Sequence, residues 1–213
     1  MQHVTRKAHF MSEELKEKAK INWRWTVADI TVTVVIGVAS GVIFWLGYFT
    51  HHFLDIPFAA VPGLNCLYYG LFYFPACLAA IIVRKPGAAF LGEFVAALTE
   101  FLIGTSWGAS GVLIPGLVQG IFGEIIFLFF LYRVWNVWVA TLDGAFTAFG
   151  GTVISYILWG EGTSIFSNYM IISTISGLVS GAIISGLLMW YLYKAICSTG
   201  ALDRFASGRV ARA

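Results

Sequence analysis

The sequence predicts an all-α, polytopic membrane protein with six transmembrane helices and with both termini in the cytoplasm. The first observation behind this prediction is the composition, in which 59% of the residues are hydrophobic and 11% are charged. With a mean hydropathy of +0.82, such a chain requires lipid as its solvent. The second observation is the spacing of long apolar runs, and the third is the placement of the thirteen lysines and arginines.

The apolar runs define the helices, because a transmembrane helix needs roughly 20 mainly apolar residues. The second run carries Pro57, Pro62 and Pro75 and is long, so we expect a bent or broken outer segment before it enters the bilayer. The third run is short, and we expect it to be tilted, to extend into a loop or to sit among longer neighbours. The six runs lie at about 27–50, 56–83, 88–103, 110–132, 138–158 and 168–196.

The basic residues alternate along the connections between these runs. Because short cytoplasmic loops retain positive charge, the segments that carry lysine and arginine are predicted to face the cytoplasm, and the others the outside. The basic segments are the tail up to Arg24, the pair Arg84-Lys85, Arg133, and the end from Lys194 onward. The connections without any lysine or arginine are 51–55, 104–109 and 159–168.

This topology divides the chain into three parts. We expect a cytoplasmic N-terminal tail over 1–24, a six-helix substrate-binding membrane domain over 25–197, and a cytoplasmic C-terminal tail over 198–213. The net charge of +2 reflects the cytoplasmic ends and does not indicate a nucleic-acid surface.

Several classes of function are disfavoured because the sequence lacks the residues that they need. Cys66, Cys77 and Cys197 are odd in number and show no CxxC spacing, so neither a disulfide framework nor a zinc site is indicated. There is no Walker loop, so ATP-driven transport would need a motor on another chain. The histidines lie outside the apolar runs, and no nucleophile has a plausible base beside it, so we expect neither an enzyme nor a cofactor.

Acidic and amide side chains inside the runs are the first candidates for function, because ionisable groups in hydrocarbon are costly. Glu93 and Glu100 are seven residues apart, two turns along one helix face. On the next helix, Gln119 and Glu124 lie among glycines that allow close backbone approach. No Lys, Arg or His lies in the second to fifth runs, so we expect a guest that is cationic or rich in donors. The other interpretation is that protonated glutamates bridge the helices through hydrogen bonds.

Aromatic side chains gather on the predicted outer side. Tyr68 and Tyr69 belong to the second run, and Trp107 sits in the loop Gly104–Gly108 directly after Glu100. Tryptophan and tyrosine mark membrane interfaces in general, but an indole in this position could also stack on a planar cation.

Two small residues of the first run, Gly37 and Gly41, are four positions apart. Such a pair usually packs against another helix of the same chain. A second interpretation is a docking surface for another membrane protein.

An ordered set of motifs resembles a known family. The stretch Arg84-Lys-Pro-Gly-Ala-Ala89, then Glu93, Glu100, the Trp107-Gly108 loop and Gln119-Gly-Ile-Phe-Gly-Glu124, resembles the YkoE-type substrate-binding subunits of energy-coupling-factor (ECF) vitamin transporters. The ending Ser198-Thr-Gly-Ala-Leu202 is similar to that family's tail.

The resemblance implies a six-helix vitamin-binding subunit of a bacterial cell membrane, which is not an enzyme by itself. Such subunits work with a transmembrane coupling protein and two ATP-hydrolysing subunits, and this group takes up thiamine or its hydroxymethylpyrimidine precursor. Carried over by position, the resemblance implies substrate contacts at Glu93, Glu100, Gln119 and Glu124.

The residues themselves fit that chemistry. Thiamine has a thiazolium charge and an aminopyrimidine edge, which an aromatic ring and a carboxylate or amide complement. We therefore expect Glu100 and Gln119 to form hydrogen bonds with the pyrimidine. Glu93 or Glu124 would balance charge or orient Glu100 and Gln119. Trp107, with Tyr68 or Tyr69, would stack on the ligand. The alternative is a proton-coupled secondary transporter of a small organic cation, with the intramembrane glutamates exchanging protons.

Overall fold

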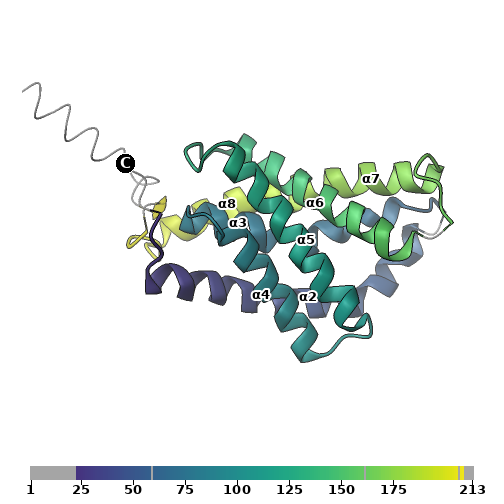
Figure 1. Ribbon diagram of the computed structural model, residues 1–213, viewed down its shortest axis with the longest axis horizontal. Coiled ribbons are helices and arrows are strands. Elements are labelled where there is room, and N and C mark those ends of the chain that lie inside the picture. The colour runs from purple at the N-terminus through teal and green to yellow at the C-terminus, as the bar shows by residue number, and fades with distance from the viewer. Residues whose placement is uncertain (1–22, 59, 161, 206, 209–213) are drawn as a thin grey trace, which may run out of the picture.

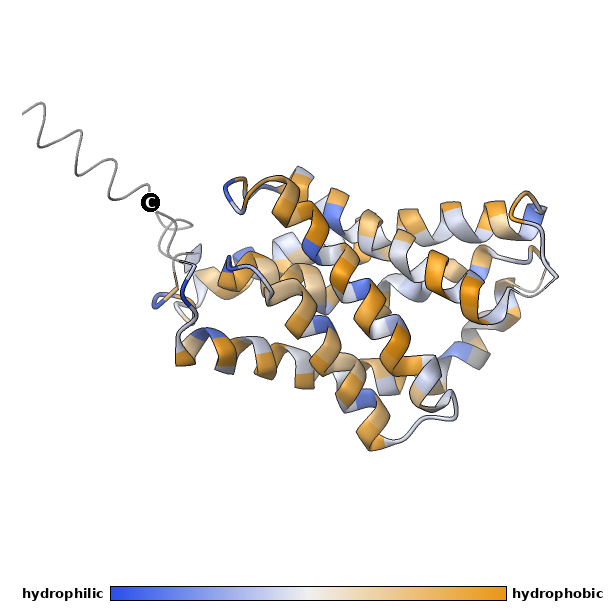
Figure 2. Ribbon diagram, viewed as in Figure 1, coloured by the Kyte–Doolittle hydropathy of each residue, from blue (hydrophilic) through white to orange (hydrophobic). Residues whose placement is uncertain are grey.

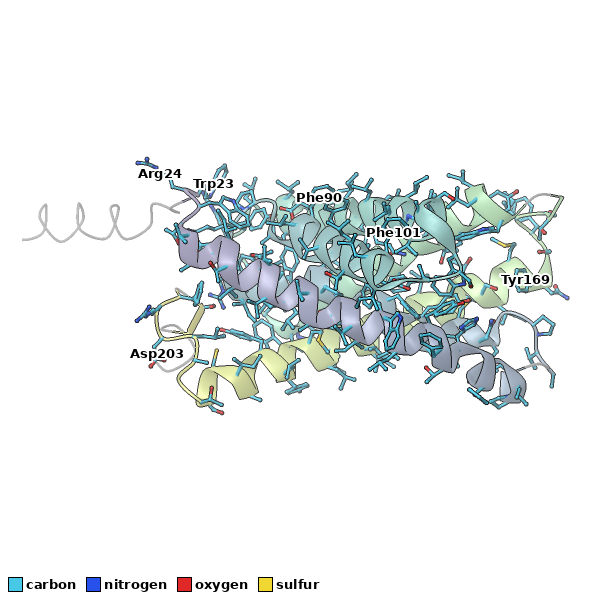
Figure 3. The ribbon with its side chains drawn as sticks, turned by 90° about the horizontal axis from the view of Figure 1, so that it is seen from below. Trp23, Arg24, Phe90, Phe101, Tyr169 and Asp203 are labelled. Atoms are coloured by element: carbon cyan, nitrogen blue, oxygen red, sulfur yellow. The ribbon has the colours of Figure 1, made fainter. Side chains whose placement is uncertain are left out.

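The protein is described by a computed structural model that covers residues 23–58, 60–160, 162–205 and 207–208. These residues form helices joined by turns and contain no strand, so the all-α prediction is confirmed. The predicted N-terminal tail lies outside the described residues except for Trp23 and Arg24, which Figure 3 labels at one end of the molecule.

The helices form an elongated bundle, in which α4 and α5 cross obliquely over the longer elements (Figure 1). Each predicted run contains one or more of them. In chain order they are α2 (Val27–Phe58), the 3₁₀-helix η1 (Leu64–Phe72), α3 (Phe74–Val83), α4 (Ala88–Ile103), α5 (Gly108–Phe129), α6 (Val137–Trp159), α7 (Asn168–Ser180), the π-helix η2 (Gly181–Leu188) and α8 (Met189–Ser198).

Five segments among the described residues are long and apolar enough to cross a membrane. They are Val27–His51, Leu64–Val83, Gly108–Phe129, Val137–Trp159 and Asn168–Ser198. Helix α4 has 16 residues, which gives a length of about 24 Å at about 1.5 Å per residue. It packs between α2, α3 and α5, so the expected short helix is present inside the bundle.

The second apolar run is broken, as its prolines predict. Helix α2 ends just after Pro57, and the chain turns through Gly63, whose φ of 96° is left-handed. The 3₁₀-helix η1 follows, and a regular helix begins only at α3, with Pro75 in its first turn. A proline is tolerated there because the first turn of a helix needs no intrahelical N–H donor.

Every residue of α3 is buried, so this short helix forms the centre of the bundle. The other helices surround it and expose many apolar side chains on their outer faces. Figure 2 shows hydrophobic residues along the whole length of the helices, with a few hydrophilic positions among them. This distribution fits a protein whose outer surface faces lipid.

Glycines bring α2 onto α4. A Cβ atom at Gly37 would lie 2.6 Å from Cβ of Val95, and one at Gly41 would lie 2.5 Å from the carbonyl oxygen of Ala96. Both glycines are buried by these contacts. Gly37 and Gly41 therefore pack against α4 within the chain, and the docking surface that we considered at these positions stays a prediction.

The two ends of the bundle differ in character. The basic end carries Arg84, Lys85, Arg133, Lys194 and Arg204, and the aromatic end carries Trp107, Trp159 and Tyr169. Figure 3 labels Arg24 and Asp203 at the former and Tyr169 at the latter. At the basic end Lys85 forms an ion pair with Asp29 and donates a hydrogen bond to the carbonyl of Arg24 at 2.6 Å.

The C-terminal segment folds against the basic end. Arg84 lies over the ring of Trp135, 5.1 Å from its centroid, and donates to the hydroxyl of Tyr193 at 3.1 Å. Tyr193 in turn donates to the carbonyl of Ser207 at 2.8 Å, and the Ser207 hydroxyl donates to the carbonyl of Ile82 at 2.6 Å. Burial lowers the pKa of the Arg84 guanidinium, yet arginine stays charged at neutral pH. The start of the predicted C-terminal tail thus belongs to the folded bundle.

Candidate binding site

A cavity of about 490 Å³ lies toward the aromatic end of the bundle. Its walls come from α2, η1, α4, α5, α6 and α7, together with the loops that follow α4 and α6. This volume lies within the usual range of small-molecule sites, roughly 300–1,000 Å³. The cavity is therefore large enough for a ligand of vitamin size.

Glu100 provides the acidic group of the cavity. It lies in the last turn of α4, lines the cavity and is 3% exposed. Its Oε1 has no hydrogen-bond partner within the described part of the chain, and no ion pair between described side chains involves it. A buried carboxyl group of this kind is suited to a ligand that brings a positive charge or hydrogen-bond donors.

Gln119 lies on α5 and lines the same cavity. Its place depends on close approach of α5 to α4, which small residues permit. A Cβ at Gly116 would lie 2.4 Å from Cβ of Ala97, and one at Gly120 would lie 3.1 Å from the carbonyl oxygen of Phe90. The Gln119 amide supplies both an acceptor and two donors, so it can pair with a ligand edge that presents both.

Aromatic rings supply much of the remaining wall. Trp107 lines the cavity and is 38% exposed, in a loop where Gly104 and Gly108 have left-handed φ values of 118° and 71°. Its ring packs 5.9 Å from that of Phe72. Tyr69 also lines the cavity, and a planar ligand can stack on such rings.

Tyr68 does not line the cavity. It is 8% exposed and packs edge-on against Tyr69, with ring centroids 4.8 Å apart. The structure therefore places Tyr68 behind Tyr69.

Glu93 lies deeper in the bundle than Glu100 and is fully buried. Its Oε2 accepts the backbone N–H of Ala76 at 3.1 Å, in the first turn of α3. The first turn of a helix leaves N–H groups without intrahelical partners and favours negative charge. Glu93 is thus a cap of α3 and does not line the cavity.

Glu124 caps another helix and lies at the basic end, away from the cavity lining. Its carboxylate accepts the N–H groups of Gly87, Ala89 at 3.1 Å and Phe90 at 3.3 Å. Gly87 is the N-cap of α4, and Ala89 and Phe90 lie in its first turn. The arrangement explains why an acid occurs so far along α5, since it closes the turn that precedes α4.

The structure adds hydroxyl groups that we had not assigned to the site. Thr152, Ser155 and Ser173 line the cavity on α6 and α7. Ser173 is 6% exposed, and its hydroxyl has no hydrogen-bond partner among the described groups. The spacing of Thr152 and Ser155, three residues apart on one helix face, is the signal in the sequence that could have indicated them.

Comparison with known proteins gives consistent results. Residues 28–150 match the family model described as "ABC-type cobalt transport system, permease component". The chain is 33% identical over 188 residues, 87% of its length and 91% of the relative's, to a protein of Bacillus subtilis (strain 168) named HMP/thiamine permease protein YkoE. A solved structure described as an S-component of an ECF transporter superposes with a TM-score of 0.80 at 28% identity, covering 89% of this chain and 94% of that one.

A helical membrane bundle that encloses a ligand-sized cavity, with relatives that are transport proteins and not enzymes, defines a substrate-binding transport component. The chain belongs to the YkoE-type substrate-binding subunits, or S components, of ECF transporters.

Proposed function

We propose that this S component captures thiamine or its hydroxymethylpyrimidine precursor from outside the cell for ATP-driven uptake by partner subunits. The observation that carries the proposal is the pair Glu100 and Gln119 in one cavity, with an unpartnered carboxyl oxygen on Glu100. The printed name of the Bacillus relative, an HMP/thiamine permease, supports the same substrate class.

The aminopyrimidine ring accounts for the polar side of the cavity. Its amino group donates to the Glu100 carboxylate, and its ring nitrogen accepts from the Gln119 amide. A hydrogen bond to an ionised group contributes about 1.5–3 kcal/mol. Because both side chains would be left without partners by an apolar ligand, this pair selects for polar heterocycles.

The rings of Trp107 and Tyr69 account for the other side. The thiazolium of thiamine is planar and positively charged, so it stacks favourably on an electron-rich ring. Tyr68 supports Tyr69 from behind. Glu93 and Glu124 orient the site indirectly, because Glu93 fixes the start of α3 and Glu124 fixes the start of α4, the helix that carries Glu100.

For the membrane topology we propose six spans, with α4 as the short sixth one. The basic end then faces the cytoplasm of a bacterial cell and the cavity faces outward, with both termini on the cytoplasmic side. The clustering of basic residues at one end of the bundle supports this orientation.

For the partners we propose a transmembrane coupling subunit and two ATPase subunits. The chain carries no Walker loop, so the nucleotide must be hydrolysed by other chains. Purified protein in liposomes is expected to bind substrate but not to accumulate it until those subunits are added. Uptake that the isolated chain sustains with a proton gradient would instead establish the proton-coupled alternative.

A binding titration tests the substrate proposal. Thiamine and hydroxymethylpyrimidine are added separately to detergent-solubilised protein, and tryptophan fluorescence is recorded for the wild type, Glu100→Gln and Asp203→Asn. Asp203 is exposed at the basic end, so its substitution is the matched carboxylate-to-amide control. Saturable quenching that Glu100→Gln weakens and Asp203→Asn preserves supports the proposal, and equal affinities in all three proteins would contradict it.

A further inference from the structure

A second group of polar side chains lies in the interior, outside the cavity lining. Glu93 on α4, with Asp143 and Thr147 on α6, are all 0% exposed. Within the described residues, four of their oxygens have no hydrogen-bond partner: Oε1 of Glu93, both carboxyl oxygens of Asp143, and Oγ1 of Thr147. Buried oxygens of this kind are costly unless something satisfies them.

Helix packing brings the three residues to one junction. Asp143 and Thr147 are one turn apart on the same face of α6. A Cβ at Gly123 of α5 would lie 3.0 Å from Oγ1 of Thr147 and 2.9 Å from Cβ of Ala76. The N–H of the same Ala76 is the donor to Glu93, so residues of α3, α4, α5 and α6 meet here. Glu93 and Asp143 are close enough to interact electrostatically.

Among the described residues, none that faces this carboxyl pair carries a positive charge. The Cys77 thiol lies beside Asp143, but a thiol is a weak donor, and its Sγ donates to the carbonyl of Ala140 at 3.6 Å. Helix η2, which packs on α6, contains no titratable residue. Asp29 of α2, which packs on α4, is at the basic end and paired with Lys85. The titratable groups that face the pair are Tyr73, Cys77, Glu100 and Glu124.

Two ionised carboxylates in this position would be buried next to each other without a compensating cation, which is a very unfavourable arrangement. A metal centre has no support, because no three His, Cys, Asp or Glu residues of the described chain are grouped to hold one. A proton makes one of the two carboxyl groups neutral and turns it into a hydrogen-bond donor. The one remaining negative charge then lies on the other carboxyl group.

We propose that Glu93, Asp143 and Thr147 form a buried proton-binding site in which Asp143 is a neutral carboxylic acid. Asp143 carries the proton because Glu93 already accepts a backbone N–H whereas neither oxygen of Asp143 does. The unpartnered oxygens of Glu93 and Thr147 at the same junction are the acceptors for that proton, directly or through a water molecule.

The site has a consequence for the cavity, and this step rests on the proposed function. An ionised Asp143 would add a second buried negative charge beside Glu93, which itself interacts with Glu100, and like charges oppose one another's ionisation. A neutral Asp143 therefore limits the buried negative charge on this side of Glu100 to that of Glu93. The buried proton thus lowers the opposition to a Glu100 carboxylate that faces a cationic substrate.

Infrared spectroscopy of the substrate-free protein in lipid tests the site. A protonated carboxyl group has a carbonyl stretch above the amide I band. At neutral pH the wild type should show it, and Asp143→Asn should lose intensity equivalent to one carboxyl group. The control is Asp203→Asn, because Asp203 is exposed at the basic end and its replacement should leave the band unchanged.

The wild-type spectrum alone can overturn the proposal, whether or not any variant folds. Absence of the band at neutral pH excludes a protonated Asp143, and a band that stays at full intensity in folded Asp143→Asn assigns the proton elsewhere. Absence of the band together with a Na⁺-dependent rise in the melting temperature of the wild type would make this a sodium site and contradict the proposal. Because no substrate is present, failure of thiamine to bind has no effect on this test.

Discussion

Replacing Glu124 distinguishes a helix cap from a substrate contact. Its carboxylate accepts three backbone N–H groups at the start of α4. With a net contribution of about 1 kcal/mol for each hydrogen bond, Glu124→Ala should lower the free energy of unfolding by about 3 kcal/mol. Glu124→Gln keeps one acceptor oxygen but loses the charge, so a loss of about 1–2 kcal/mol is expected, within the range of measured N-cap substitutions.

The assay is reversible unfolding in detergent, followed by circular dichroism, with ligand affinity measured on the folded fraction. Because Glu124 is not part of the cavity lining, the affinity of folded Glu124→Gln should match that of the wild type. Tenfold weaker binding of thiamine by a variant whose stability is unchanged would refute the capping argument and make Glu124 a substrate contact.

Three further predictions follow from close contacts and from the rings. Gly116→Val places a Cβ 2.4 Å from a side-chain carbon of α4, so thermal melts should show about 1–3 kcal/mol of destabilisation. The control is Gly177→Ala, whose Cβ would make its nearest contact at an ordinary 3.5 Å, and this variant should melt like the wild type. Trp107→Phe should remove much of the fluorescence response to thiamine, whereas Trp138→Phe, at a site 79% exposed and outside the cavity lining, should keep it; the same loss in both would contradict the assignment. Tyr193→Phe removes the hydroxyl that donates to the C-terminal segment, so limited proteolysis should cut that segment faster. The free energy of unfolding should fall by about 1 kcal/mol. Unchanged cleavage would show that the hydrogen bond from Tyr193 does not hold the segment in place.

The fold was largely predictable from the sequence because each membrane helix is a long run of apolar residues. The apolar runs locate the helices, the prolines around Pro57 and Pro75 locate the break before α3, and the short run at 88–103 coincides with α4. The path of the chain after Ser198 was not predictable. Its place depends on the hydrogen bonds of Ser207 with Tyr193 and with Ile82, which no local pattern encodes.

The candidate site was predictable only in part. Periodicity places Glu93 and Glu100 on one face of α4, but it gives neither depth nor partners. Glu93 finds its donor 17 residues earlier in the chain, and Glu124 finds the donor of Phe90 34 residues earlier. These two hydrogen-bonded caps depend on which helix N-termini lie close to the glutamates in space. Contact of Glu93, Glu124 and Glu100 with substrate stays a prediction.

Hydroxyl groups of the cavity were missed for a different reason. Serine and threonine in transmembrane helices commonly bond to the carbonyl one turn earlier, and Thr152 does so to Ala148 at 3.1 Å. Such a residue carries no sign of a binding role in the sequence. Ser173 differs because its hydroxyl has no partner among the described groups, a property that only the packed structure reveals.

The measurement that tests the central claim most directly is the dissociation constant of thiamine for the wild type and Glu100→Gln, by tryptophan fluorescence. Loss of one charge-assisted hydrogen bond, about 1.5–3 kcal/mol, predicts roughly 10- to 150-fold weaker binding for the variant. Saturable wild-type binding with a decrease of that size supports an S component that reads its substrate through Glu100. Folded wild-type protein that binds neither thiamine nor hydroxymethylpyrimidine, or a Glu100→Gln variant with unchanged affinity, would contradict it.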